Sequence, residues 1–219
     1  MKLFMIRAII FDLDGVIIST DEYHYLAWKA VADKEGIYFD REINNRLRGV
    51  SRMDSLDIIL ERANKEYSQT EKESLAQEKQ NIYRNYLSQL TPKDLSDDAI
   101  YTINKLHELG YSLGIGSSSK NTKYILERIN LLNAFEFIAD GTMISHSKPN
   151  PEVFLKAAEG LGLKPSECVV VEDAYSGIDA GNGGGFLTIG IGDAYNYKKA
   201  DYHIKSLKEI VDIVQQLNK

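Results

Sequence analysis

Hydrophobic residues follow two patterns along the chain, short apolar runs and longer stretches with helical spacing. The run Ala8–Phe11 is unbroken, which is typical of a strand buried on both faces of a parallel sheet. Further runs that predict strands lie at residues 111–116, 137–140, 169–173, 187–192 and 201–204. Helical spacing lies between these runs, and a last helix is expected over residues 207–217. Strands that alternate with helices predict a doubly wound α/β fold with a parallel sheet.

The first connection in this pattern is much longer than a crossover helix needs. About ninety residues, nearly all with helical spacing, separate the first two predicted strands, whereas an ordinary crossover takes about a dozen. We therefore predict a helical domain at residues 19–90, inserted into an α/β core formed by residues 1–18 and 91–219. Two short hinges, near Ser19 and near residues 87–91, would join the two parts.

Polar groups follow four of the predicted strands at the point where each strand ends. They are Asp12 and Asp14, then Ser117 to Asn121, then the stretch from Asp140 to Lys148, and finally Glu172 and Asp173. The carboxyl ends of parallel strands share one edge of the sheet, and ligands bind at that edge in open α/β folds. Taken singly, each group has an ordinary explanation as a turn, a helix cap or a surface charge. Their occurrence at successive strand ends favours an active site.

Carboxylates gathered at one edge require a cation, because two like charges ~4 Å apart repel by about 4 kcal/mol at an effective dielectric constant near 20. Oxygen ligands without His or Cys favour Mg²⁺ over Zn²⁺. Mg²⁺ beside a carboxylate, a serine and a lysine is an arrangement for phosphoryl transfer, in which Ser117 and Lys148 stabilise phosphate oxygens. Asp12 is the candidate nucleophile that forms an aspartyl phosphate, and Asp14 is the candidate general acid and base.

Composition narrows the classes of partner. The formal net charge of −6, without a long run of one sign, does not suggest nucleic-acid or anionic-membrane binding. No apolar run is long enough to span a membrane, and no signal peptide is recognisable. The only cysteine, Cys168, lies in an apolar run and is expected to be buried and inert, which suits a reducing cytoplasm. We expect a cytoplasmic protein that acts on a small molecule, with a monomer as the default.

These residues resemble the haloacid dehalogenase superfamily of phosphatases and phosphomutases. The matching motifs are Asp12–Val16, Ser117, Lys148 with Pro149, and Glu172-Asp173 with Gly177. The resemblance covers the whole chain and implies a Rossmann-like core of the haloacid dehalogenase type with an inserted helical cap domain. Within the superfamily the chain is most similar to the β-phosphoglucomutase family, through Glu22-Tyr23-His24 with Trp28, residues 47–52 with Asp54 and Ser55, and residues 117–121.

This narrower resemblance implies the interconversion of β-D-glucose 1-phosphate and β-D-glucose 6-phosphate through β-glucose 1,6-bisphosphate. It implies that Asp12, the backbone carbonyl of Asp14 and Asp173 hold Mg²⁺, with Glu172 in support. Arg52 would bind a second phosphate together with residues of the loop after the second strand. The substrate contacts that it implies are Thr20, His24, Trp28, Gly49, Val50, Arg52, Ser55 and Lys79 in the cap, and Ser117, Ser118, Ser119, Lys120, Asn121 and Lys148 in the core.

The chain departs from the family pattern at two places. Residues 181–185 are glycine-rich where the family has an alanine-rich helix end, so we expect that helix to be short or frayed. Ala174 stands where serine is common, which removes a hydroxyl that would cap the helix.

Two other functions use the same fold. A capped Mg²⁺-dependent phosphatase of small sugar phosphates would pass the phosphoryl group to water and would need no second phosphate grip. A non-catalytic sensor of sugar phosphates would not need the acidic pair Asp12 and Asp14. Arg52, His24 and Lys120 favour the mutase over the phosphatase, and the intact acidic set argues against the sensor.

Overall fold

The computed structural model describes residues 5–47 and 50–219 of the chain. Within these residues, six strands form one parallel sheet in the order β3-β2-β1-β4-β5-β6. The strands are β1 (Ala8–Phe11), β2 (Ser112–Gly116), β3 (Phe137–Ala139), β4 (Cys168–Glu172), β5 (Leu187–Gly190) and β6 (Tyr202–His203). Each strand overlaps an apolar run of the sequence, and the predicted α/β class with a parallel sheet is confirmed.

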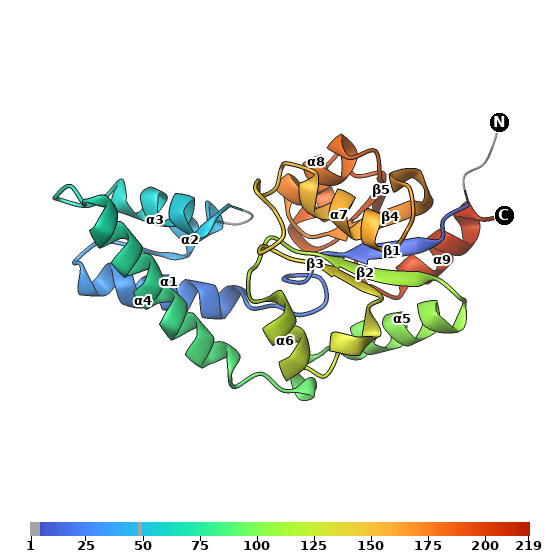
Figure 1. Ribbon diagram of the computed structural model, residues 1–219, viewed down its shortest axis with the longest axis horizontal. Helices are drawn as coiled ribbons and strands as arrows, with labels where there is room; N and C mark the ends of the chain where they lie inside the picture. Colours follow the sequence, from blue (N-terminus) through green and yellow to red (C-terminus); the bar gives the residue numbers. More distant parts are fainter. Residues whose placement is uncertain (1–4, 48–49) are drawn as a thin grey trace. The chain divides into compact units, whose positions relative to one another are not determined.

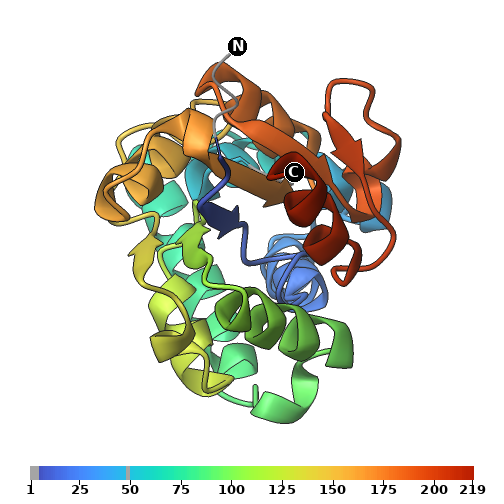
Figure 2. The ribbon, with the colours of Figure 1, turned by 90° about the vertical axis from the view of Figure 1, so that its right-hand side faces the viewer.

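Strand β1 lies inside the sheet, between β2 and β4 (Figure 2). All of its residues are buried, which explains why it is an unbroken apolar run. Phe11, its last residue, pairs with Ile115 of β2 and Val171 of β4. This register places Asp12 and Glu172, which follow those pairs, at the same edge of the sheet.

Helices cover both faces of this sheet (Figure 1). The helices α7 and α8 pack against one face, while α5 lies on the other face beside β2 and contacts α9. The core helices are α5 (Asp97–Glu108), α6 (Thr122–Arg128), α7 (Glu152–Gly160), α8 (Tyr175–Gly183) and α9 (Glu209–Leu217), with 3-10 turns at Pro92–Asp94, Leu132–Ala134, Pro165–Glu167 and Gly192–Asn196. Phe154 of α7 packs with Ile10 and Val170 in a buried cluster. Cys168 is buried as expected, and burial raises the pKa of its thiol to about 12.

The described residues separate into two compact units, one of which is the continuous segment Thr20–Leu90. This segment contains α1 (Asp21–Lys34), α2 (Arg41–Asn45), α3 (Arg52–Leu60) and α4 (Gln69–Leu87). Its helices share their own hydrophobic core around Trp28, Leu56 and Leu75, with α1 and α3 both packed on α4. We propose that this unit is the inserted helical domain expected at residues 19–90. None of the helices in the described ranges combines the length and the apolar character that crossing a membrane requires.

The helix α8 is nine residues long and ends at Gly183, within the glycine-rich segment. Gly181 is buried in this helix, and a Cβ atom there would lie 2.6 Å from the Cγ2 atom of Thr188 on β5. Thr188 is itself fixed, since its backbone N–H donates to Asp201 at 2.8 Å and its hydroxyl lies 3.1 Å from both Asp201 and Asn182. Gly181 therefore allows the close approach of α8 and β5, whereas a Cβ at Gly183 would meet nothing within 4 Å.

This difference predicts opposite effects of two alanine substitutions. Gly183→Ala should raise the free energy of unfolding by about 0.5–1 kcal/mol, because alanine loses less backbone entropy on folding. Gly181→Ala should lower it, because its methyl group overlaps Thr188. Urea titration of both variants beside the wild type measures the two changes, and a stabilising Gly181→Ala would contradict the close packing.

Candidate active site

The carboxyl edge of the sheet holds a buried lysine between two buried carboxylates. The ammonium group of Lys148 donates hydrogen bonds to Asp12 at 2.6 Å and to Glu172 at 2.9 Å. Burial by itself lowers the pKa of Lys148, but the two carboxylates outweigh it and hold the pKa above its ordinary value. Burial raises the pKa of Glu172 to about 7, although Lys148 opposes that rise. The lysine is therefore a permanent cation at this edge.

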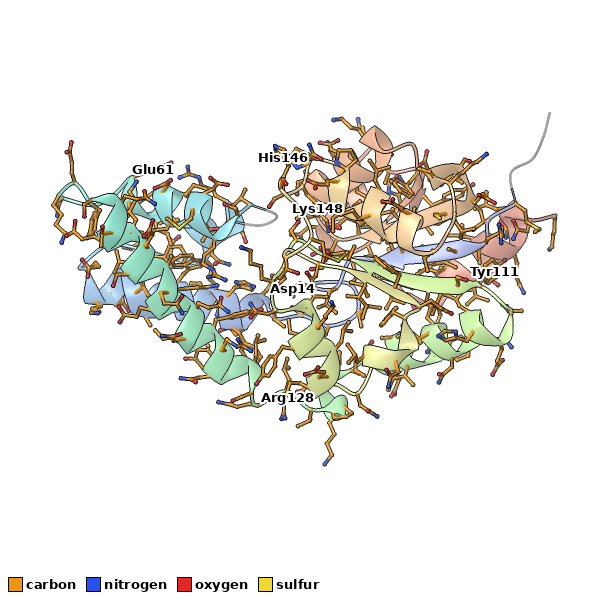
Figure 3. All side chains as sticks on the ribbon, viewed as in Figure 1. Asp14, Glu61, Tyr111, Arg128, His146 and Lys148 are labelled. Atoms are coloured by element: carbon orange, nitrogen blue, oxygen red, sulfur yellow. The ribbon has the colours of Figure 1, made fainter. Side chains whose placement is uncertain are left out.

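Three acidic residues in the described part of the chain form a group with the geometry of a metal site. Asp12, Glu172 and Asp173 each offer a carboxylate oxygen, and these oxygens lie within 4.8 Å of one another. Asp14 is not one of these three carboxylates, and the metal contact expected of it, through its backbone carbonyl, stays a prediction. Asp14 lies in the turn beyond β1, where its backbone pairs with Ile18. It nevertheless lies at the same end of the sheet as Lys148 (Figure 3).

Two glycines make room for the acidic residues. A Cβ atom at Gly15, whose φ is +81°, would lie 2.1 Å from a carboxylate oxygen of Asp173. At Gly177 it would lie 2.0 Å from the carboxyl carbon of Glu172. Any side chain at either position would push away a residue of the acidic group.

Glu172 is hydrogen-bonded to the backbone at the start of α8. Ala174 precedes α8 and makes no side-chain capping bond, but its backbone N–H donates to a carboxylate oxygen of Glu172 at 3.2 Å. Glu172 thus accepts bonds from the start of α8 and from Lys148 at once, which fixes the orientation of its carboxylate.

The loop that follows β2 is organised by its own hydroxyl groups. The buried Ser117 hydroxyl accepts a hydrogen bond from the backbone N–H of Ser119 at 3.3 Å, and the Ser119 hydroxyl accepts one from Asn121 at 3.2 Å. The hydroxyl oxygen of Ser118 is buried without a hydrogen-bond partner in the described residues, and Lys120 is exposed. These five residues come from one segment at the carboxyl edge of the sheet.

The helical unit contains a second group of candidate residues, centred on Lys79. The ammonium group of Lys79, which is almost fully buried, lies 2.8 Å from Nδ1 of His24. It also lies 4.4 Å from the ring centroid of Tyr83 and 5.1 Å from that of Trp28. Burial, Lys79 and Arg52 together hold the pKa of His24 well below its usual value. His24 is therefore neutral and accepts a hydrogen bond from the Lys79 ammonium group at Nδ1, which leaves the ring hydrogen on Nε2.

The other predicted residues of this unit are distributed around that group. The hydroxyl groups of Thr20 and Tyr83 lie 2.8 Å apart, and Trp28 belongs to the hydrophobic core. Arg52 is half-buried at the start of α3, Ser55 is buried in the same helix, and Val50 is exposed. Gly49 lies outside the described residues.

Tyr83, which was not among the residues predicted from the sequence, contacts three of them. Its ring lies against His24 with centroids 4.1 Å apart, beneath the ammonium of Lys79, and its hydroxyl reaches Thr20. Lys79 and Tyr83 are four residues apart on α4, a spacing that places both side chains on one helix face. This spacing is the feature of the sequence that could have identified Tyr83.

The sequence and the fold of the chain match known proteins. A family model described as haloacid dehalogenase-like hydrolase matches residues 6–185, and the chain belongs to that family. The β-phosphoglucomutase of Bacillus subtilis (strain 168) is 38% identical over 206 residues, which cover 93% of this chain and 91% of that protein. A phosphorylated carbohydrates phosphatase of Thermotoga maritima is 26% identical over 196 residues, which cover 89% of each chain. The crystal structure of a β-phosphoglucomutase from Clostridium difficile superposes with a TM-score of 0.90 at 39% identity, covering 98% of this chain and 97% of that one.

The low pKa of His24 predicts a pH-dependent stability. In the unfolded chain His24 takes up a proton below about pH 6.5, but in the folded chain it does not. The free energy of unfolding therefore decreases as the pH falls. Between pH 7 and 5.5 the free energy of unfolding should decrease by roughly 1 kcal/mol more in the wild type than in His24→Asn. Asparagine keeps an acceptor for Lys79 but cannot titrate. Urea unfolding at both pH values measures this difference.

A second variant tests whether Lys79 contributes to the low pKa of His24. Lys79→Met removes one of the two cations that act on His24, so the pH dependence should become smaller than in the wild type. Parallel pH profiles for the wild type and His24→Asn would show that His24 titrates alike in the folded and unfolded chains.

Proposed function

We propose that the protein is a β-phosphoglucomutase, which interconverts β-D-glucose 1-phosphate and β-D-glucose 6-phosphate through β-glucose 1,6-bisphosphate. The proposal rests first on the family and on relatives that carry this name at 38% and 39% identity. It also rests on basic residues in each unit of the chain, Lys148 beside the acidic group of the core and Lys79 with Arg52 in the helical unit. A substrate that passes through a bisphosphate needs a site for each phosphate.

The basic pair Lys79 and Arg52 of the helical unit is the observation that favours a mutase over a simple phosphatase. Lys79 is buried and Arg52 is half-buried, and burial lowers the pKa of Arg52. Arg52, a cation held partly away from water, gains free energy when an anion joins it. We assign the second phosphate to Arg52, Lys79 and the loop residues Ser118 to Asn121.

The acidic edge of the core would carry out the transfer. The oxygen-donor set of Asp12, Glu172 and Asp173 fits Mg²⁺, which would supply positive charge to the phosphate oxygens when bound. A carboxylate oxygen of Asp12 attacks phosphorus, and the bond from phosphorus to the sugar oxygen breaks. Asp14 gives its proton to that oxygen and later removes one from the second hydroxyl. Lys148 and the Ser117 hydroxyl stabilise the transferring phosphate.

We further propose that the protein acts as a monomer in a reducing cytoplasm, on a small sugar phosphate. The chain carries both sets of basic residues itself, so no second copy is required to complete them. Its single cysteine is buried and held as a thiol by a raised pKa, which suits that compartment.

A product assay tests the proposed reaction. With Mg²⁺, β-glucose 1-phosphate and a trace of β-glucose 1,6-bisphosphate, we expect glucose 6-phosphate as the main product. The α anomer should not be converted. Asp12→Asn should abolish formation of the phosphorylated enzyme, which intact mass spectrometry detects. The relative from Thermotoga maritima makes a sugar phosphatase the second candidate, and inorganic phosphate with free glucose as products would establish it instead.

Substitution of Arg52 tests the second phosphate site. Arg52→Ala should lower kcat/KM for β-glucose 1-phosphate by roughly 10–100-fold, the size expected when charge-assisted hydrogen bonds to phosphate are lost. Hydrolysis of acetyl phosphate, which has one phosphate, should change by less than about twofold because it needs no second grip. Arg46→Ala is the matched control, because Arg46 is an exposed arginine of the same unit that pairs with Glu61. Equal losses on both substrates would remove the argument for two phosphate sites.

A further inference from the structure

The backbone that follows β3 is bonded to the loop that follows β2. The backbone N–H of Ser117 donates to the carbonyl of Ala139 at 3.1 Å, which continues the pairing of β2 with β3 one residue beyond the end of β2. Two residues later the loop accepts instead of donating, because the N–H of Gly141 donates to the carbonyl of Ser119 at 3.1 Å. Two different residues of the segment at the end of β3, Ala139 and Gly141, thus hold Ser117 and Ser119 of this loop.

Gly141 lies against this loop at a distance that no other residue allows. A Cβ atom at Gly141 would be 2.2 Å from the carbonyl oxygen of Ser118 and 3.0 Å from the backbone nitrogen of Lys120. Both are backbone atoms, so no side-chain rotation can relieve the overlap. The loop would have to move, and the part that would move is residues 118–120.

Asp140 holds Gly141 in its place. Its carboxylate is buried and accepts hydrogen bonds from the backbone N–H and the hydroxyl of Thr142, while its own carbonyl accepts one from the N–H of Met143. The ammonium group of Lys123 approaches the other carboxylate oxygen to 4.0 Å. These bonds close a turn over residues 140–143 and fix the direction of the Gly141 N–H.

We propose that Gly141, fixed by Asp140, positions the Ser118 to Asn121 half of the loop for the second phosphate of the substrate. The proposal rests on the mutase function and assigns a role to two residues that touch neither phosphate. Ser117 is anchored one step earlier, through Ala139, so it keeps its place when Gly141 is changed. The two phosphate sites therefore respond differently to this position, and the residues are positioning residues rather than catalytic ones.

The experiment compares two substrates with Gly141→Ala. Phosphorylation of the enzyme by acetyl phosphate uses the Ser117 side of the loop and should stay within about twofold of the wild type. The KM for β-glucose 1-phosphate and the Kd for glucose 6-phosphate, measured by calorimetry, should rise, with kcat/KM falling on the order of 100-fold, as expected for a displacement near 1 Å. Gly183→Ala is the matched control, because a Cβ there meets nothing within 4 Å, and it should leave all three quantities unchanged.

Substitution of Asp140 provides a second and milder perturbation if Gly141→Ala folds poorly. Asp140→Ala removes the acceptor for Thr142 and should raise the same KM and Kd, whereas Asp140→Asn keeps an acceptor oxygen and should restore most of the affinity. Equal effects on acetyl phosphate and on the sugar phosphates, or no effect of either variant, would overturn the positioning role. If the wild type releases inorganic phosphate instead of forming glucose 6-phosphate, the mutase proposal fails, and the Kd for glucose 6-phosphate still decides the role of Gly141.

Discussion

The buried ion pairs of Lys148 are the interaction on which the carboxyl edge of the sheet depends. Its ammonium group bonds Asp12 at 2.6 Å and Glu172 at 2.9 Å, and all three side chains are buried. Removing such charges from water costs several kcal/mol per ion, and only close opposite charges with good hydrogen bonds offset that cost. With Asp173 included, three carboxylates face one lysine, and the excess of negative charge is what a divalent cation would neutralise.

The backbone makes this concentration of charge possible. Parallel pairing of β1 with β4 brings Asp12 and Glu172 to one edge, and Gly15 and Gly177 leave the space that their neighbours' carboxylates occupy. The loop after β2 follows the same principle, since Gly141 lies where a side chain would strike its backbone. The positions of the charged groups at this edge therefore depend on the absence of side chains at these glycines.

The sequence predicted the parts of this structure that depend on local pattern. Each strand follows an apolar run, and the polar groups at four strand ends lie on the adjacent strands β3, β2, β1 and β4. Prediction was weaker where two distant segments meet. The contacts of Tyr83 were missed because they run from α1 to α4.

The sequence by itself determined the α/β class, the inserted helical segment and the identity of the acidic and basic residues, because periodicity and strand-end motifs are properties of a short stretch of chain. Only the tertiary structure decided which carboxylates lie close enough to share a metal ion, which histidine is neutral and which glycine lies too close to another element to carry a side chain. Gly181 and Gly183 stand two residues apart in one helix, yet only Gly181 lies against a side chain of another element. Distances between segments far apart in sequence decide such questions, and no local pattern encodes them.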